Sequence, residues 1–208
     1  MIASAPTNMR ASILGAALLG AVVISCGPPP QPPTGKLVWS FACDTSVPME
    51  MECGNAPESL IEGTSRRMPP PQLEVGCFID ATGANVAFRV FIEQTRSDGQ
   101  VFGLSRVCGT TTSAGGVVAN AKVSARFGVA RINGVGTGSG TGPSCDVRVT
   151  EVTATSIKGQ LRCARVPDDS SRFRRINGVA PPASPSTVDP EWAEFSFTNC
   201  VSGAGVCQ

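Results

Sequence analysis

The chain contains no histidine and no tyrosine, and only two of its 208 residues are tryptophan. Without histidine and tyrosine, the Ser/His/Asp and Cys/His arrangements of hydrolases, imidazole metal sites and tyrosine acids are excluded. A pair of carboxylates can still cleave a glycosidic bond. The acidic pairs close in sequence are Glu191 with Glu194 and Asp168 with Asp169. Both pairs are better explained as solvent-facing charges, so we expect no enzyme.

Motifs for a cofactor or a metal are also missing. The cysteines never form the Cys-x2-Cys pairs that are typical of zinc sites, and no histidine accompanies them. The glycine-rich segment 134–142 lacks the lysine and the spacing of a phosphate-binding loop. Asp80–Asn85 and Asp168-Asp169 offer too few spaced carboxylates for a dedicated calcium site. We therefore predict neither a metal nor a cofactor.

Neither sign of charge is in excess. The chain has 17 lysines and arginines against 16 acidic residues, and residues 1–25 hold one of the basic residues and none of the acidic ones. A protein that binds nucleic acid is expected to carry a basic surplus with clustered arginines. The two basic clusters, Arg66-Arg67 and 172–175, are short, and we predict that they lie on solvated loops. We therefore predict no nucleic-acid partner.

Long hydrophobic runs are absent as well. The longest apolar segment, residues 11–24, falls short of the roughly 20 residues that a membrane-spanning helix needs. Arg10 directly precedes it, and a positive residue followed by a short apolar run is typical of a secretory signal peptide. Met9 is an alternative start to Met1, and either start leaves the apolar segment unchanged.

The apolar segment leads into Val23-Ile24-Ser25-Cys26. This tetrapeptide resembles the lipobox of bacterial lipoproteins, in which the cysteine is lipidated and becomes the first residue of the mature protein. The resemblance is confined to this N-terminal region, and it implies a signal peptide over 1–25 and acyl chains such as palmitate on Cys26. Because Gly27 rather than aspartate follows the cysteine, the resemblance also implies sorting to the outer membrane where the source has one.

Residues 26–35 are rich in proline. Such a segment is expected to adopt the extended polyproline conformation, with a rise of about 3.1 Å per residue. We interpret it as a spacer between the lipid on Cys26 and a single domain over residues 36–208.

Cysteine, in contrast, is abundant. Apart from Cys26 the chain has an even number of cysteines, which in an exported protein predicts disulfides. They are Cys43, Cys53, Cys77, Cys108, Cys145, Cys163, Cys200 and Cys207. Cys145 and Cys163 share the parity of their apolar neighbours, which favours a cross-strand or an inter-sheet disulfide from this hairpin and leaves the partners open. Spacing alone does not fix the connectivity, but the short separations favour local pairs for Cys43 with Cys53 and for Cys200 with Cys207.

Alternating apolar and polar residues predict β-strands. The predicted strands lie at 36–43, 73–79, 86–92, 101–107, 117–132, 145–149, 157–163 and 192–198. Turn signals separate them, as at Asp80–Asn85 and Ala154–Ser156, and two long connections are predicted at 44–72 and 166–190. No amphipathic helix is predicted after residue 35. The pattern predicts an all-β fold, an antiparallel β-sandwich or open barrel stapled by disulfides.

The two tryptophans are predicted to have different roles. Trp39 lies within the alternating segment 36–43, on its apolar side, and is predicted to be in the core. Trp192 has the opposite parity from Phe195 and Phe197, which are predicted to face inward. Trp192 is therefore the one residue that we predict to contact a ligand.

These features together predict a non-enzymatic envelope lipoprotein that binds another envelope component or packs in a surface assembly. Two other hypotheses stay open. The first is a carbohydrate-binding or carbohydrate-active β-sandwich, which an acid-lined cleft beside Trp192 would favour. The second is an accessory subunit of an envelope complex, in which segment 44–72 becomes ordered on its partner.

Overall fold

The computed structural model describes residues 29–43, 59–67, 71–128, 130–135, 145–167, 173–177, 192–203 and 207. All regular elements in this part of the chain are β-strands, which confirms the predicted all-β class. Accordingly, the described residues include no helix of the length and hydropathy needed to cross a membrane.

The strands are more numerous than the sequence predicted. They are β1 (Thr34–Cys43), β2 (Ser59–Thr64), β3 (Gln72–Thr82), β4 (Asn85–Thr95), β5 (Val101–Thr112), β6 (Gly115–Gly128), β7 (Ala130–Val135), β8 (Cys145–Val152), β9 (Ser156–Pro167), β10 (Phe173–Asn177), β11 (Ala193–Thr198) and β12 (Val201–Ser202).

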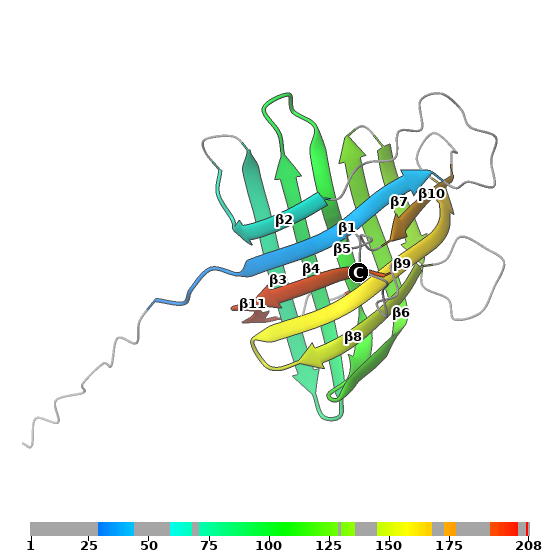
Figure 1. Ribbon diagram of the computed structural model, residues 1–208. Helices are drawn as coiled ribbons and strands as arrows, with labels where there is room; N and C mark the ends of the chain where they lie inside the picture. The colour runs from blue at the N-terminus through cyan, green and yellow to red at the C-terminus, as the bar shows by residue number, and fades with distance from the viewer. Residues whose placement is uncertain are drawn as a thin grey trace, which may run out of the picture.

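The strands form one curled sheet in the order β10-β1-β11-β9-β8-β6-β5-β4-β3-β12, with β2 beside β1 and β7 beside β6. We call β1, β2 and β8 to β11 sheet A, and β3 to β7 with β12 sheet B. Strand β6 joins them, because Gly116 and Val117 pair with β8 while later residues pair with β5 and β7. Sheet A crosses in front of sheet B at a steep angle, so the two sheets face each other (Figure 1). All pairings are antiparallel except that of β12 with β3.

The core lies between the two sheets. Alternate residues of each strand point into it, as in β4, where every second residue from Val86 to Ile92 is buried. Trp39 is fully buried, as predicted, and its ring centroid lies 6.4 Å from that of Phe127. Phe127 in turn makes an edge contact with Phe102, with centroids 4.8 Å apart. These rings connect β1 of sheet A with β5 and β6 of sheet B.

Three disulfides are described. Cys145–Cys163 joins β8 to β9 at directly paired positions, so of the two alternatives for this hairpin the cross-strand disulfide is the one formed. The other two are Cys77–Cys200 and Cys108–Cys207. The predicted local pair of Cys200 with Cys207 is therefore wrong. The physical reason is that β12 runs along the edge strand β3. Cys200 therefore lies beside β3, where it bonds to Cys77, and Cys207 bonds to Cys108 on β5.

The remaining disulfide prediction concerns Cys43 and Cys53. Cys53 lies outside the described residues, and so does the side chain of Cys43, so this pair stays a prediction. Cys26 also lies outside them.

Four predicted boundaries differ from the structure. The connections 44–72 and 166–190 contain strands β2 and β10, and β12 follows the segment predicted as the last strand. Segment 117–132 is two strands rather than one, because β6 ends at Gly128, whose φ of 63° suits glycine, and β7 returns antiparallel to it.

The first strand also begins earlier than expected. β1 starts at Thr34, inside the range 26–35 assigned to the spacer, and pairs there with both β2 and β11. Just before it, the carbonyl oxygen of Pro32 accepts a hydrogen bond of 3.2 Å from Asn199 Nδ2. The end of the proline-rich segment is therefore attached to the sheet.

Candidate functional site

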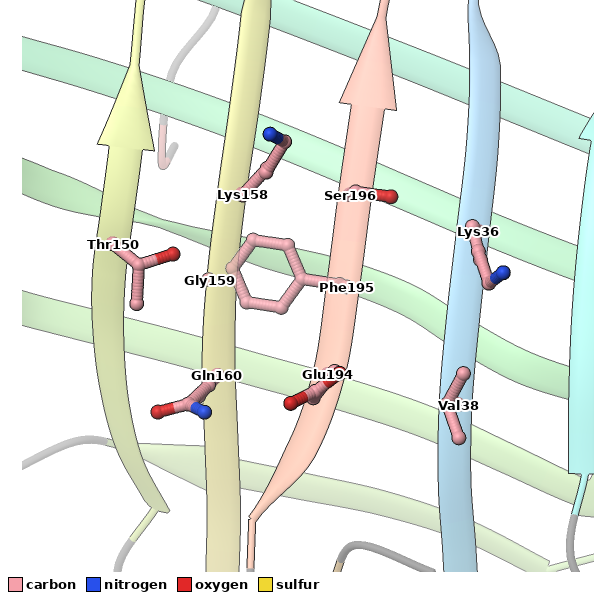
Figure 2. Close-up of a pocket in the computed structure, with 9 residues that line it drawn as sticks. All are labelled: Lys36, Val38, Thr150, Lys158, Gly159, Gln160, Glu194, Phe195 and Ser196. Atoms are coloured by element: carbon pink, nitrogen blue, oxygen red, sulfur yellow. The ribbon is translucent and has the colours of Figure 1, made fainter. Parts of the chain in front are cut away.

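A shallow groove of about 250 Å³ crosses the outer face of sheet A. Figure 2 shows side chains from four neighbouring strands around it. The lining residues are Lys36, Val38, Thr150, Lys158, Gly159, Gln160, Glu194, Phe195 and Ser196. Most of them alternate with buried residues on β1, β8, β9 and β11, and so they face away from the core.

The floor of the groove depends on a glycine. A Cβ at Gly159 would lie 2.4 Å from Phe195 Cζ and 2.6 Å from the carbonyl oxygen of Arg148, which is too close for any other residue. Gly159 pairs directly with Phe195, and the phenylalanine ring reaches across to the glycine (Figure 2). The ring thus fills the space that a side chain at this position would need.

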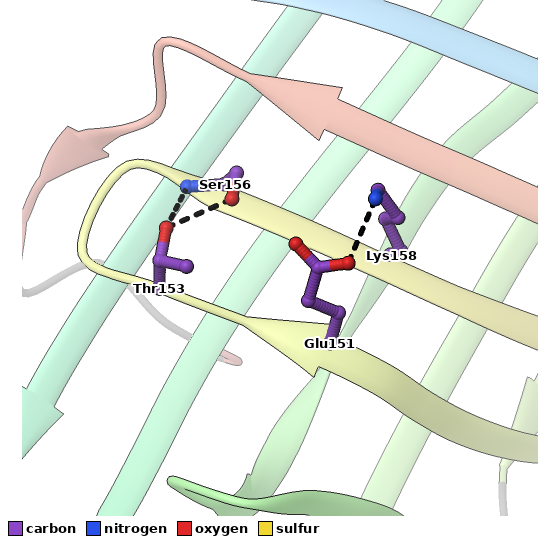
Figure 3. Close-up of polar contacts among 4 residues, drawn as sticks. All are labelled: Glu151, Thr153, Ser156 and Lys158. Carbon is purple, nitrogen blue, oxygen red and sulfur yellow. Dashed lines mark hydrogen bonds and ion pairs between the residues drawn. The ribbon is translucent and has the colours of Figure 1, made fainter.

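Most charges around the groove are paired across strands. Lys158 Nζ lies 2.7 Å from Glu151 Oε2, as Figure 3 shows, and Lys36 Nζ lies 3.4 Å from Glu62 Oε2. All four side chains are about half exposed, so each pair stabilises the fold only weakly. Glu194 is the one carboxylate among the described residues that line the groove.

The hairpin between β8 and β9 is closed by hydroxyl groups. Thr153 Oγ1 accepts hydrogen bonds from the backbone N–H groups of Thr155 and Ser156, at 3.2 and 3.0 Å, and lies 2.8 Å from Ser156 Oγ (Figure 3). A threonine that bonds to the backbone of its own turn holds that turn in one conformation. Further along the hairpin, Val149 pairs with Gly159 and Glu151 with Lys158, so Thr150 is the extra residue of a β-bulge in β8.

Trp192 lies on the same outer face, immediately before β11. Its neighbour along that face is Glu194, roughly 7 Å further along the strand. The side chain of Trp192 is partly buried, and the guanidinium carbons of Arg162 and Arg148 lie 4.7 and 5.4 Å from its ring centroid. Arg162 Nε also lies 3.0 Å from Asp146 Oδ2. The tryptophan thus lies near the end of the groove marked by Glu194, is not itself a lining residue, and is in contact with two arginines.

The structure places only some of the acidic residues that the sequence singled out. Glu194 lines the groove, whereas Glu191, Asp168 and Asp169 lie outside the described residues. No group of three or more acidic or cysteine side chains is arranged to hold a metal ion in the described part of the chain. Asp80 lies on β3, in sheet B, away from the groove.

Sequence reasoning missed most residues of the groove. Lys36, Lys158 and Gln160 are at outward positions of strands that were correctly predicted, so their direction was available from strand parity. Which strands are neighbours was not available, because β1 pairs with β11 and β11 with β9, far from their order in the chain.

The groove offers lysine ammonium, amide, hydroxyl and carboxylate groups beside a partly exposed indole, a set that can hydrogen-bond a polar ligand. Glycosidic cleavage needs two carboxylates, and the described lining residues supply one. No family model, no curated protein and no solved structure matches this chain.

Proposed function

We propose that this chain is an envelope lipoprotein, held at the membrane by acyl chains on Cys26, whose β domain binds another envelope component without catalysing a reaction. The observation that carries the binding role is the polar groove beside Trp192 on the outer face of sheet A. The lipobox-like segment supports the anchor. The three described disulfides support export, because such bonds persist in oxidising compartments.

The chemistry of the groove favours a polar partner of low net charge. The lysines that line it already lie close to carboxylates on neighbouring strands, so an ionic ligand gains little there. The amide of Gln160 and the hydroxyls of Thr150 and Ser196 remain as groups that recognise by hydrogen bonding. Such a set suits a protein surface or a glycan.

The anchor is tested by expressing the full chain in a bacterial host that processes lipoproteins. We expect the wild-type protein in the membrane fraction, with an acylated cysteine as its first residue by mass spectrometry. The variant Cys26→Ser is expected to lose the acyl chains and to keep residues 1–25 attached. An unmodified Cys26 in the mature wild-type protein would contradict the proposal.

A second candidate function is carbohydrate binding, which is favoured by the position of the groove directly beside an indole ring. Sugars stack on tryptophan, and the side chains of the groove could bind their hydroxyl groups. We expect Trp192→Ala to reduce sedimentation of the protein with insoluble peptidoglycan. Leu60→Ala is the matched control, since Leu60 is an exposed apolar residue of the same sheet that does not line the groove. Equal binding by both variants would exclude this role for Trp192.

A further inference from the structure

A second hollow, of about 300 Å³, lies on the outer face of sheet B. Its polar lining consists of Arg89, Arg106, Arg126, Arg131, Ser105 and Ser124. We call it the arginine pocket, and we propose that it binds an anion that carries phosphate groups. This inference does not depend on the groove of sheet A or on the lipid anchor.

Four neighbouring strands each contribute one arginine. Arg89 comes from β4, Arg106 from β5, Arg126 from β6 and Arg131 from β7. Arg126 is paired directly with Arg131, and Arg106 with Ser124. The register of the sheet thus gathers onto one surface four cations from four successive strands.

A β-bulge in β5 completes the pocket. On the β4 side, the two residues between Leu104 and Val107 lie opposite a single residue, Phe91. On the β6 side, Arg106 pairs with Ser124 and Ser105 is the extra residue. Leu104 and Val107 are buried, whereas Ser105 and Arg106 are both partly exposed. Bulges of this kind redirect side chains and are common beside functional sites. Here the bulge directs a hydroxyl and a guanidinium to the same outer surface.

The charged side chains that line the pocket are all arginines. Arginine remains protonated at any physiological pH, and the described residues that line the pocket include no carboxylate. The nearest identified carboxylate is that of Glu93, whose Oε1 lies 3.5 Å from Arg126 Nε and accepts a hydrogen bond of 2.5 Å from Ser105 Oγ. Arg89 Nε is buried with no hydrogen-bond partner in the described structure. An anion bound among these guanidinium groups would be stabilised by their positive charge.

Phosphate fits this chemistry best. The planar guanidinium donates two parallel hydrogen bonds to phosphate oxygens, and these charge-assisted bonds are stronger than neutral ones. Several arginines in one hollow favour a group with more than one negative charge. The source is either a free phosphate compound or the phosphate of a lipid headgroup.

Calorimetric titration of the full chain in neutral detergent tests the proposal. Two probes distinguish the sources: inorganic pyrophosphate stands for a free phosphate compound, and glycerophosphoglycerol stands for a phosphodiester headgroup. We expect saturable binding of at least one probe, weakened by added salt. The double variant Arg89→Gln/Arg131→Gln is expected to weaken that binding at least tenfold. The control Arg66→Gln/Arg67→Gln removes the same charge from the connection between β2 and β3 and is expected to bind like the wild type.

Each outcome of the titration is informative. Binding of pyrophosphate alone supports a free phosphate ligand, and binding of the diester supports a lipid headgroup. Arg131→Gln serves as a second variant, because Arg131 is exposed and its replacement leaves the core intact; it is expected to weaken binding by itself. The proposal is overturned if neither probe binds, or if the control pair loses as much affinity as the pocket variants.

Discussion

The outer faces of the two sheets differ in how their basic side chains are arranged. On sheet A, basic side chains lie close to carboxylates of neighbouring strands, as in Lys36–Glu62, Lys158–Glu151 and Arg162–Asp146. On sheet B, four arginines surround one hollow and Glu93 is the carboxylate identified beside them. The basic residues of one face are paired within the sheet, whereas those of the other line the pocket that we propose to bind an anion. The near-zero net charge of the chain therefore gives no sign of the four arginines that the fold brings together.

The two sheets share one hydrophobic core, and Phe195→Ala tests this. It is expected to have the largest effect on stability. The ring of Phe195 is 2% exposed and packs beneath the groove of sheet A. Its removal is expected to lower the free energy of unfolding by about 3–5 kcal/mol. Urea unfolding followed by tryptophan fluorescence and by circular dichroism should show one shared transition. Two separate transitions would mean that the sheets unfold independently and that the faces are not properties of one domain.

The disulfides allow the two faces to be perturbed separately. Cys108 pairs in register with Arg89 and Lys122, so its bond to Cys207 borders the arginine pocket, while Cys145–Cys163 lies within sheet A. Removal of either bond by double alanine substitution is expected to cost about 2–4 kcal/mol.

Only the loss of Cys108–Cys207 is expected to weaken pyrophosphate binding as well, because it frees the backbone beside Arg89. Thermal unfolding and calorimetry on the two double variants measure both effects. If Cys145→Ala/Cys163→Ala reduced the affinity for pyrophosphate to the same degree, the arginine pocket would not depend specifically on the Cys108–Cys207 bond.

The contact of Arg162 with Trp192 gives a smaller effect, confined to sheet A. Arg162→Gln removes a cation–π contact and an exposed ion pair, and is expected to lower the stability by about 0.5–1 kcal/mol. It should also change the fluorescence of Trp192, since the nearer of the two guanidinium groups no longer lies over the ring. The fluorescence of Arg162→Gln/Trp192→Phe, which retains Trp39 alone, provides the reference. An unchanged spectrum in the single variant would show that this contact is not formed in solution.

The smallest effect is expected at the ion pairs of sheet A. Glu151→Gln breaks the contact with Lys158, and because both side chains are about half exposed, the stability should change by no more than about 0.5 kcal/mol. The difference should disappear in high salt. Lys158→Gln is the reciprocal control. A loss of stability well above this value would contradict the view that the ion pairs of sheet A contribute little to the fold.

The sequence allowed much of the fold to be predicted, because its longer strands alternate clearly. Strand β4 and the hairpin of β8 and β9 follow from apolar parity, and the same parity favoured a disulfide from this hairpin without fixing its partners. The short strands β2 and β10 were missed because they contain little apolar alternation; pairing with β1 stabilises them.

The arginine pocket could not be predicted from parity. Arg106 is two residues from Leu104, which faces the core, so an unbroken strand would direct this arginine inward. The bulge at Ser105 reverses that direction, and no pattern in the segment marks it. The groove of sheet A was not predicted for a different reason. Its residues come from strands that are neighbours in the sheet only through long-range pairing.

The connectivity of the last two described cysteines has a consequence for oxidative folding. Cys200 and Cys207 are close in the chain, so closing a loop between them costs less entropy than joining either one to its distant native partner. An oxidant that acts before the sheet has formed therefore favours the wrong bond. The native bonds require either that β3 and β5 are in place before oxidation or that a thiolate reshuffles the early product. Refolding yield should thus depend on a thiol–disulfide buffer.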